Sequence, residues 1–349
     1  MFVGLRDLWF AKGRFLLMTT VIALVAFLVV MLSGLTEGLA AQNTSGIADL
    51  SGSHIVFSDS PDGASFTQSR IDTSELASWA SIEGVNGVAP LGVTRSALST
   101  EDSVIPVAVF GTEPGSFISP SALADSSTAV VTSAVASSYG INNGDTVTIG
   151  DATFRAAIVD GDTSFSHSPV VWIGLDQWQT LAGAQDTTSV VVVDAEGSVG
   201  SHATDGMIVM PIDSTFSAIG SFSEENGSLQ MIRWFLLVIS ALVVGAFFTV
   251  WTIQRRHDVA VLKAMGASTR YLLIDALGQA SIVLVGAASI GGMLGFLVGR
   301  LLSGVVPFAS DVGTTITPLA SLVIIGLAGA ALAIRSITKV DPLTALGGN

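Results

Sequence analysis

Five side chains near the ends of two apolar runs are the best candidates for binding a ligand. Met31 and Glu37 lie near the end of the first run, and Met231, Arg233 and Trp234 open the second. A carboxylate, two thioethers, a cation and an indole ring at one depth would suit an amphipathic, metal-containing ligand with carboxylate tails. The alternative is structural, because Arg and Trp often anchor a membrane interface and Met often fills packing gaps.

Nucleotide hydrolysis is a chemistry for which this sequence lacks the motif. A P-loop requires Gly-Lys-Ser/Thr after a glycine-rich turn, and none of Lys12, Lys263 and Lys339 stands in that context. We therefore expect that the chain is not an ATP-hydrolysing enzyme. Any energised work would use ATP bound to a separate subunit.

The histidines and serines show no catalytic or metal-binding spacing. His54, His167 and His202 are far apart, without an HExxH motif, and His257 lies among basic residues. The serines form no Gly-x-Ser-x-Gly motif. We expect the first three histidines at surface or loop positions and His257 at a partner or a lipid headgroup. We expect no intrinsic cofactor and no metal site of the protein's own.

The composition is that of a membrane protein. Half of the 349 residues are hydrophobic and only 12% are charged, whereas soluble proteins carry roughly 25% charged residues. Four apolar runs reach or approach the roughly 20 residues that a spanning helix needs. We predict transmembrane helices at 15–36, 231–254, 271–302 and 317–335, with an interfacial helix at 1–14 and an outer loop at 303–316.

The distribution of basic residues predicts which side of the membrane each segment faces. The region between the first two spans contains no lysine, and its only arginines are Arg70, Arg95 and Arg155. Because basic loops stay in the cytoplasm, we expect both termini there and residues 37–230 outside. A cleaved signal peptide ending near Ala41 is the alternative, which the length of the first apolar run disfavours. The acidic balance, with a pI near 4.4, argues against nucleic-acid binding.

Residues 37–230 are expected to form an extracytoplasmic α+β domain with a stalk. β-branched segments predict strands at 54–57, 104–110, 146–149, 154–159, 170–173 and 189–193. A helix is predicted at 73–81 with Trp79 facing inward, and a turn at 142–145. The chain has no cysteine, so this domain depends on its apolar core rather than on disulfides.

Two segments, 255–270 and 336–349, are expected on the cytoplasmic side after the first span. The first is basic and amphipathic, and the second contains an Asp-Pro pair typical of a helix start. Both are candidates for docking a partner. The residues predicted to take part are Arg255, Arg256, Leu262, Lys263, Met265, Gly266, Asp341 and Pro342.

Two sets of glycines have the four-residue spacing that lets helix backbones approach closely. In the third span, Gly291, Gly295 and Gly299 favour packing within one chain. Near the outer end of the first span, Gly34 and Gly38 are candidates for an interface between two copies of the chain.

The sequences LKAMGAS at 262–268 and DPLTAL at 341–346 make the chain resemble the FtsX-like, MacB-type ABC-transporter permeases. That family has one span, a large outer domain, three further spans and a cytoplasmic ending of this kind. The resemblance implies a homodimeric permease in the cell membrane, bound to a separate cytoplasmic ABC ATPase and moving substrate from the lipid or the outer side.

Within that family, three stretches resemble the haem-exporting permeases: residues 33–39, 246–254 and 347–348. This resemblance implies removal of haem, as a transported ligand, from the cytoplasmic membrane. The alternatives are a permease that exports a peptide or lipid, and an FtsX-type mechanical signalling protein that acts on a cell-wall hydrolase. A membrane-anchored enzyme is disfavoured because no catalytic constellation is present.

Overall fold

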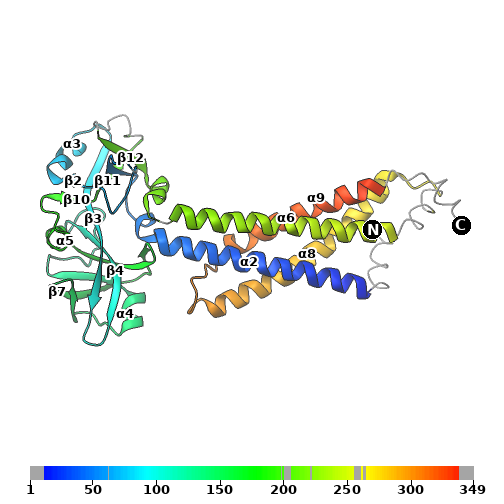
Figure 1. Ribbon diagram of the computed structural model, residues 1–349, viewed down its shortest axis with the longest axis horizontal. Helices are drawn as coiled ribbons and strands as arrows, with labels where there is room; N and C mark the ends of the chain where they lie inside the picture. The colour runs from blue at the N-terminus through cyan, green and yellow to red at the C-terminus, as the bar shows by residue number, and fades with distance from the viewer. Residues whose placement is uncertain are drawn as a thin grey trace. The chain divides into compact units, whose positions relative to one another are not determined.

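A computed structural model describes residues 12–61, 63–197, 199, 206–220, 222–254, 261 and 265–337 (Figure 1). The chain divides into two compact units, one made of residues 1–38 and 227–349 and the other of residues 39–226. We call them the helical unit and the ectodomain. The ectodomain was predicted at 37–230, and the predicted segments 1–11 and 338–349 lie outside the described residues.

Four helices of the described chain are long and apolar enough to cross a membrane. This confirms the predicted fold class of four spans with a large domain between the first two. They are α2 (Lys12–Ala48), α6 (Phe222–Gln254), α8 (Thr269–Leu302) and α9 (Val312–Ile337). Its 37 residues make α2 about 55 Å long, well beyond the ~30 Å hydrocarbon thickness. The last turns of α2 accordingly belong to the ectodomain.

Helix α9 begins earlier than the sequence predicted. We placed its start at residue 317, where the apolar run begins, but the helix begins at Val312. Asp311 supplies the cap, since its Oδ1 accepts a hydrogen bond from the Thr314 backbone N–H at 2.5 Å.

The four helices share two buried apolar clusters. One joins Met18 and Ile22 of α2 to Phe248 of α6, Leu284 of α8 and Ala330 of α9. The second also draws on all four helices. Glycines set the closest crossings: a Cβ on Gly291 would strike the Ala23 carbonyl oxygen, and one on Gly295 would lie 3.1 Å from the Phe27 carbonyl oxygen. The spacing in the third span therefore serves packing within the chain.

The ectodomain is built on a ten-stranded sheet whose order is β12-β1-β11-β3-β4-β9-β5-β7-β6, with β8 paired to β9. Most neighbours are antiparallel, but β4–β9 and β5–β7 are parallel. Because β3 also pairs with β6, six strands from β3 to β6 close into a ring. The strands are β1 (His54–Ser58), β3 (Val85–Ser99), β4 (Val104–Thr112), β5 (Thr128–Thr132), β6 (Thr146–Ile149), β7 (Ala152–Val159), β8 (Ser164–Phe165), β9 (Ser168–Gly174), β11 (Val190–Ala195) and β12 (Met207–Pro211), while β2 (Ile71–Asp72) and β10 (Thr187–Thr188) pair separately.

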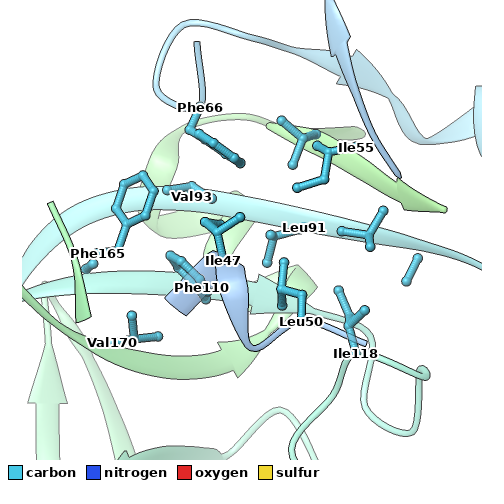
Figure 2. Close-up of a cluster of buried hydrophobic side chains, with 14 of the residues drawn as sticks. Ile47, Leu50, Ile55, Phe66, Leu91, Val93, Phe110, Ile118, Phe165 and Val170 are labelled. Atoms are coloured by element: carbon cyan, nitrogen blue, oxygen red, sulfur yellow. The ribbon is translucent and has the colours of Figure 1, made fainter. Parts of the chain in front are cut away.

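Alternating side chains give the sheet two apolar faces. In β11, Val190 and Val192 join one cluster, and Val191 and Val193 join another that contains Trp79 of α3 (Leu76–Ala80). Trp79 is buried, as predicted. The first cluster receives the last turns of α2, because Ile47 is buried among core side chains such as Phe110 and Leu91 (Figure 2). The remaining helices, α4 (Ser133–Tyr139) and α5 (Leu175–Ala182), pack on the closed ring.

Strand β3 was missing from the sequence prediction. It runs through Gly87, Pro90 and Gly92, residues that are normally depleted in strand interiors. Gly92 is required by packing, since a Cβ there would fall on the indole ring of Trp178 from α5. The six predicted strands are all present, within a few residues of their predicted ends. Like β3, strands β5 and β12 and the two-residue strands β2, β8 and β10 were not predicted.

Candidate functional site

The five predicted ligand-binding residues lie on α2 and α6 within the helical unit. Met231 and Trp234 are 59% and 63% exposed, Glu37 is exposed, and Met31 and Arg233 are half-buried. Glu37 and Arg233, both within the described part of the chain, form no ion pair with each other. These side chains therefore present free carboxylate, guanidinium, thioether and indole groups on the surface of the unit, rather than a closed pocket.

The glycines proposed for a dimer interface have another role in the structure. A Cβ on Gly34 would fall on the ring of Phe308, and one on Gly38 on the Pro307 carbonyl group. Both neighbours belong to the same chain, in the loop between α8 and α9. The small size of Gly34 and Gly38 thus serves this loop, and a helix–helix contact between copies would need another face of α2.

That other face is apolar. Leu24 and Leu28 of α2 are 58% and 44% exposed, and they lie one helical turn apart. A dimer through the first span stays a prediction, and these two residues are better placed to test it than the glycines.

The predicted coupling segment is described only in part. Arg255, Arg256, Leu262 and Lys263 lie outside the described residues, as do Asp341 and Pro342. Met265 is 71% exposed, Gly266 has a φ of +95°, and Ser268 caps α8 by accepting a hydrogen bond from the Tyr271 N–H. A left-handed glycine followed by a serine cap is a local helix-stop, helix-start signal, and it leaves the Met265 thioether free for a partner.

A polar junction at the base of the ectodomain was not predicted. The two-residue turn between β8 and β9 holds the end of α2, because the Ser166 and His167 N–H groups donate to the carbonyl oxygens of Asn43 and Gln42, each at 3.1 Å. Ser166 and His167 have φ values of +49° and +60°, a conformation that is uncommon without glycine. The predicted loop position of His167 is confirmed.

The ring of His167 is bound rather than free in that loop. Its Nε2 lies 3.0 Å from Glu225 Oε2 of α6 and 2.9 Å from Asn43 Nδ2 of α2. Three residues far apart in sequence meet here, so spacing along the chain gave no signal. The burial of the polar Asn43, 2% exposed, is visible only in the structure.

The ectodomain also contains a cavity of about 270 Å³ beside the end of α2. Leu50, Ile118 and Trp172 contribute its apolar lining, and Asp49 and Asp160 its charges. None of its lining residues is basic. The cavity therefore offers no counter-charge to a ligand with carboxylate groups.

Two family profiles divide the chain between them. Residues 15–214 match the MacB-like periplasmic core domain, and residues 231–342 match the FtsX-like permease C-terminal domain. The chain belongs to the FtsX-like, MacB-type family of ABC-transporter permeases.

Relatives cover essentially its whole length. A permease of Staphylococcus epidermidis named for a hemin transport system, HrtB, is 26% identical over 348 residues, covering 98% of each chain. An uncharacterised ABC transporter permease of Mycobacterium tuberculosis is 27% identical over 356 residues, covering 100% of this chain and 99% of its own. Among solved structures, the periplasmic region of MacB from Actinobacillus actinomycetemcomitans is 12% identical, covers 52% of this chain and 97% of its own, and has a TM-score of 0.37.

The family defines the class of protein. This chain is a multi-pass membrane protein with an extracytoplasmic domain, and its family is one of transport subunits. Membership of an ABC transporter family implies an ATPase partner.

Proposed function

We propose that the chain is the permease subunit of an ABC exporter that removes haem, or a similar membrane-partitioning amphiphile, from the cytoplasmic membrane. The observation that carries this proposal is the similarity to the permease named for hemin transport, which extends over 98% of both chains. The similarly related mycobacterial permease is uncharacterised, so haem as cargo rests on one branch of the relatives.

The chemistry of the exposed α2 and α6 residues supports this cargo. A porphyrin is apolar across its ring and carries two propionates at one edge. Arg233 would pair with a propionate through charge-assisted hydrogen bonds, while Glu37 or a methionine would approach the iron. The ectodomain cavity, without a basic lining residue, is the poorer site for such a ligand.

The assembly that we propose is a homodimer bound to separate ATPase subunits, with both chain termini in the cytoplasm. The three lysines and the basic 255–270 segment support this orientation. The exposed apolar face of α2 around Leu24 and Leu28 supports contact with a second copy or with lipid.

The test is to purify the protein together with its ATPase from cells supplied with haem. A Soret absorbance that co-elutes with the complex, and ATP hydrolysis stimulated by added haem, are the expected results. Stimulation by a peptide or a lipid instead, with no Soret band, would assign another cargo. Capture of a cell-wall hydrolase by the ectodomain without substrate-stimulated ATP hydrolysis would assign a mechanical signalling role.

A further inference from the structure

Three polar side-chain atoms form a small triangle where the end of α2 meets the sheet of the ectodomain. Its corners are Asn43 Nδ2, His167 Nε2 and Glu225 Oε2, and its sides are 2.9 Å from Asn43 to His167, 3.0 Å from His167 to Glu225 and 3.2 Å from Glu225 to Asn43. The residues come from α2, the β8–β9 turn and the first turns of α6. The structure therefore gathers them by its fold and not by any local motif.

The protonation states and amide orientations considered below do not turn all three of these contacts into favourable hydrogen bonds. If Nε2 is unprotonated, it accepts from the Asn43 amide, but its lone pair then faces the Glu225 carboxylate. If Nε2 carries a proton, that proton suits Glu225, but the Asn43 N–H₂ then faces another donor. Rotating the Asn43 amide relieves that conflict and places its oxygen against the carboxylate oxygen instead. With Glu225 ionised, each of these arrangements leaves one side repulsive.

The Asn43 side chain carries a further sign of an unmet ligand. It is 2% exposed, and its Oδ1 is buried with no hydrogen-bond partner in the described structure. Its Nδ2 has three neighbours, since it also lies 3.5 Å from the Leu39 carbonyl oxygen, but an amide has two N–H groups to donate. A buried oxygen without a partner needs an explanation. In the present orientation Nδ2, not Oδ1, lies at the triangle, so a cation there would take this oxygen only after the amide has rotated.

The size of the triangle matches one face of an octahedral metal site. Metal–nitrogen and metal–oxygen bonds of about 2.1 Å place neighbouring octahedral ligands about 3.0 Å apart, whereas a tetrahedron of the same bond length places them about 3.4 Å apart. The observed sides of 2.9–3.2 Å are close to the octahedral value and also lie in the range of ordinary hydrogen bonds. A tetrahedral ion such as Zn²⁺ would need them to lengthen by about 0.2–0.5 Å. In the octahedral arrangement the Asn43 amide turns so that Oδ1, rather than Nδ2, occupies its corner.

The three ligands are held firmly but remain open to water on one side. Asn43 is fixed by α2 and by the Ser166 N–H that donates to its carbonyl oxygen at 3.1 Å. His167 is fixed in its left-handed turn. The His167 and Glu225 side chains are 36% and 43% exposed, so solvent has access to complete the coordination of an ion.

We propose that Asn43, His167 and Glu225 bind a divalent first-row transition-metal ion. One imidazole and two oxygens are ligands that Zn²⁺, Co²⁺, Ni²⁺ or Mn²⁺ accept, and the absence of sulfur from the set disfavours softer ions. No trio composed only of His, Asp and Glu gathers in the described residues; here the third ligand is an amide oxygen. The site shares no residue with the proposed haem site, and neither proposal depends on the other.

The experiment measures Zn²⁺ binding to the full-length chain in detergent, by titration calorimetry and by metal analysis after dialysis. The wild type should bind one Zn²⁺ at this site and unfold at a higher temperature with Zn²⁺ present. His167→Asn and Glu225→Gln should weaken binding by more than the roughly 10–100-fold that loss of a group outside the coordination shell costs. Asparagine is chosen at 167 because it tolerates a positive φ.

Two further variants keep the result interpretable. His54→Asn is the matched control, since His54 is a half-buried ectodomain histidine bonded to Ser53, and it should bind Zn²⁺ as the wild type does. Rotation of the Asn43 amide would leave its N–H₂ group without a hydrogen-bond acceptor. Asn43→Asp avoids this cost, because a carboxylate has no N–H₂ group. A metal site predicts tighter Zn²⁺ binding by this variant.

Three outcomes would overturn the proposal. They are a wild type that fails to bind Zn²⁺, unaltered binding in His167→Asn and Glu225→Gln, and an Asn43→Asp chain that is destabilised and not rescued by Zn²⁺. The last result would show that the triangle is a hydrogen-bonded contact only. Because Asn43→Asp and Glu225→Gln leave the β8–β9 turn unaltered, a failure of His167→Asn to fold would still leave the question answerable.

Discussion

Gly291 of α8 meets Ala23 of α2 backbone to backbone. A Cβ added at position 291 would fall on the Ala23 carbonyl oxygen, so the two helices cross at a distance that only glycine permits. The contact lies beside the apolar clusters that α2 shares with α6, α8 and α9. The packing of α2 against α8 within the helical unit therefore depends on glycine at position 291.

Replacement of Gly291 should break this crossing. We expect Gly291→Leu to lower the free energy of unfolding of the helical unit by at least about 1–3 kcal/mol, the usual cost of overpacking, because the atom it strikes is backbone. Thermal unfolding in detergent measures the effect. Gly286→Leu is the control, since Gly286 lies on the same helix with open space at its Cβ position. Equal stability of the two variants would contradict the assigned crossing.

Gly92 in β3 should be equally intolerant. Its Cβ position is occupied by the Trp178 indole, so Gly92→Ala should destabilise the ectodomain by about 1–3 kcal/mol. Alanine in a strand would otherwise stabilise by roughly 0.5–1 kcal/mol relative to glycine. Gly220→Ala, with nothing near its Cβ position, controls for that backbone effect. Chemical denaturation followed by tryptophan fluorescence provides the measurement, and a stabilised Gly92→Ala would refute the packing.

Asp125 should make stability depend on acidity. Hydrogen bonds from the Ser127 hydroxyl, the Thr128 hydroxyl and the Ser127 N–H hold the pKa of Asp125 below its ordinary value of 3.8, the Ser127 hydroxyl having the largest effect. Because the pKa of Asp125 is lower in the folded than in the unfolded state, its contribution to stability is complete above the unfolded-state pKa. That contribution is lost as the pH falls through the folded-state pKa.

We therefore expect Asp125→Asn to unfold at a lower temperature than the wild type at pH 7. The difference between the two should shrink as the pH falls below about 4. Asp151→Asn, an equal change of charge at an exposed aspartate, serves as the control. A difference that stayed constant down to pH 2 would argue against the role of these hydrogen bonds.

The ligand candidates should differ in what their loss changes. If haem is the cargo, Glu37→Ala should shift the Soret band, because a ligand to the iron alters its spectrum. Arg233→Ala should mainly lower haem occupancy, because it loses a charge-assisted pair with a propionate. Met31→Ala and Met231→Ala complete the series, and Glu83→Ala, an exposed ectodomain carboxylate, is the control. Wild-type spectra and occupancy in all four would place the site elsewhere.

Coupling to the ATPase should depend on the apolar side of the 255–270 segment. Leu262→Asp combined with Met265→Asp should abolish co-purification of the two subunits, because it buries unpaired charge in their contact. Val104→Asp, an equally exposed apolar position of the ectodomain, should leave the complex intact. Recovery of the full complex from the double variant would contradict this docking site.

The sequence by itself determined the architecture and the family. A spanning helix requires a long run of apolar residues, and such a run can be recognised in the local sequence. All four spanning helices were therefore predictable. Six short strands rich in β-branched residues were predictable for the same reason, although β5 (Thr128–Thr132), of the same composition, was not predicted. Strand β3 was not, because Pro90, Gly87 and Gly92 oppose strand formation locally and are tolerated only through pairing and the ring of Trp178.

Only the tertiary structure decided what the small and polar residues do. The spacing of Gly34 and Gly38 indicates close approach but not the partner, and that partner is the loop at Pro307 and Phe308 of the same chain. Asn43, His167 and Glu225 are separated by more than a hundred and by nearly sixty residues along the chain, so no local pattern links them. Their meeting follows from non-local pairing: the β8–β9 turn is carried to the end of α2 by the sheet, and α6 returns beside it.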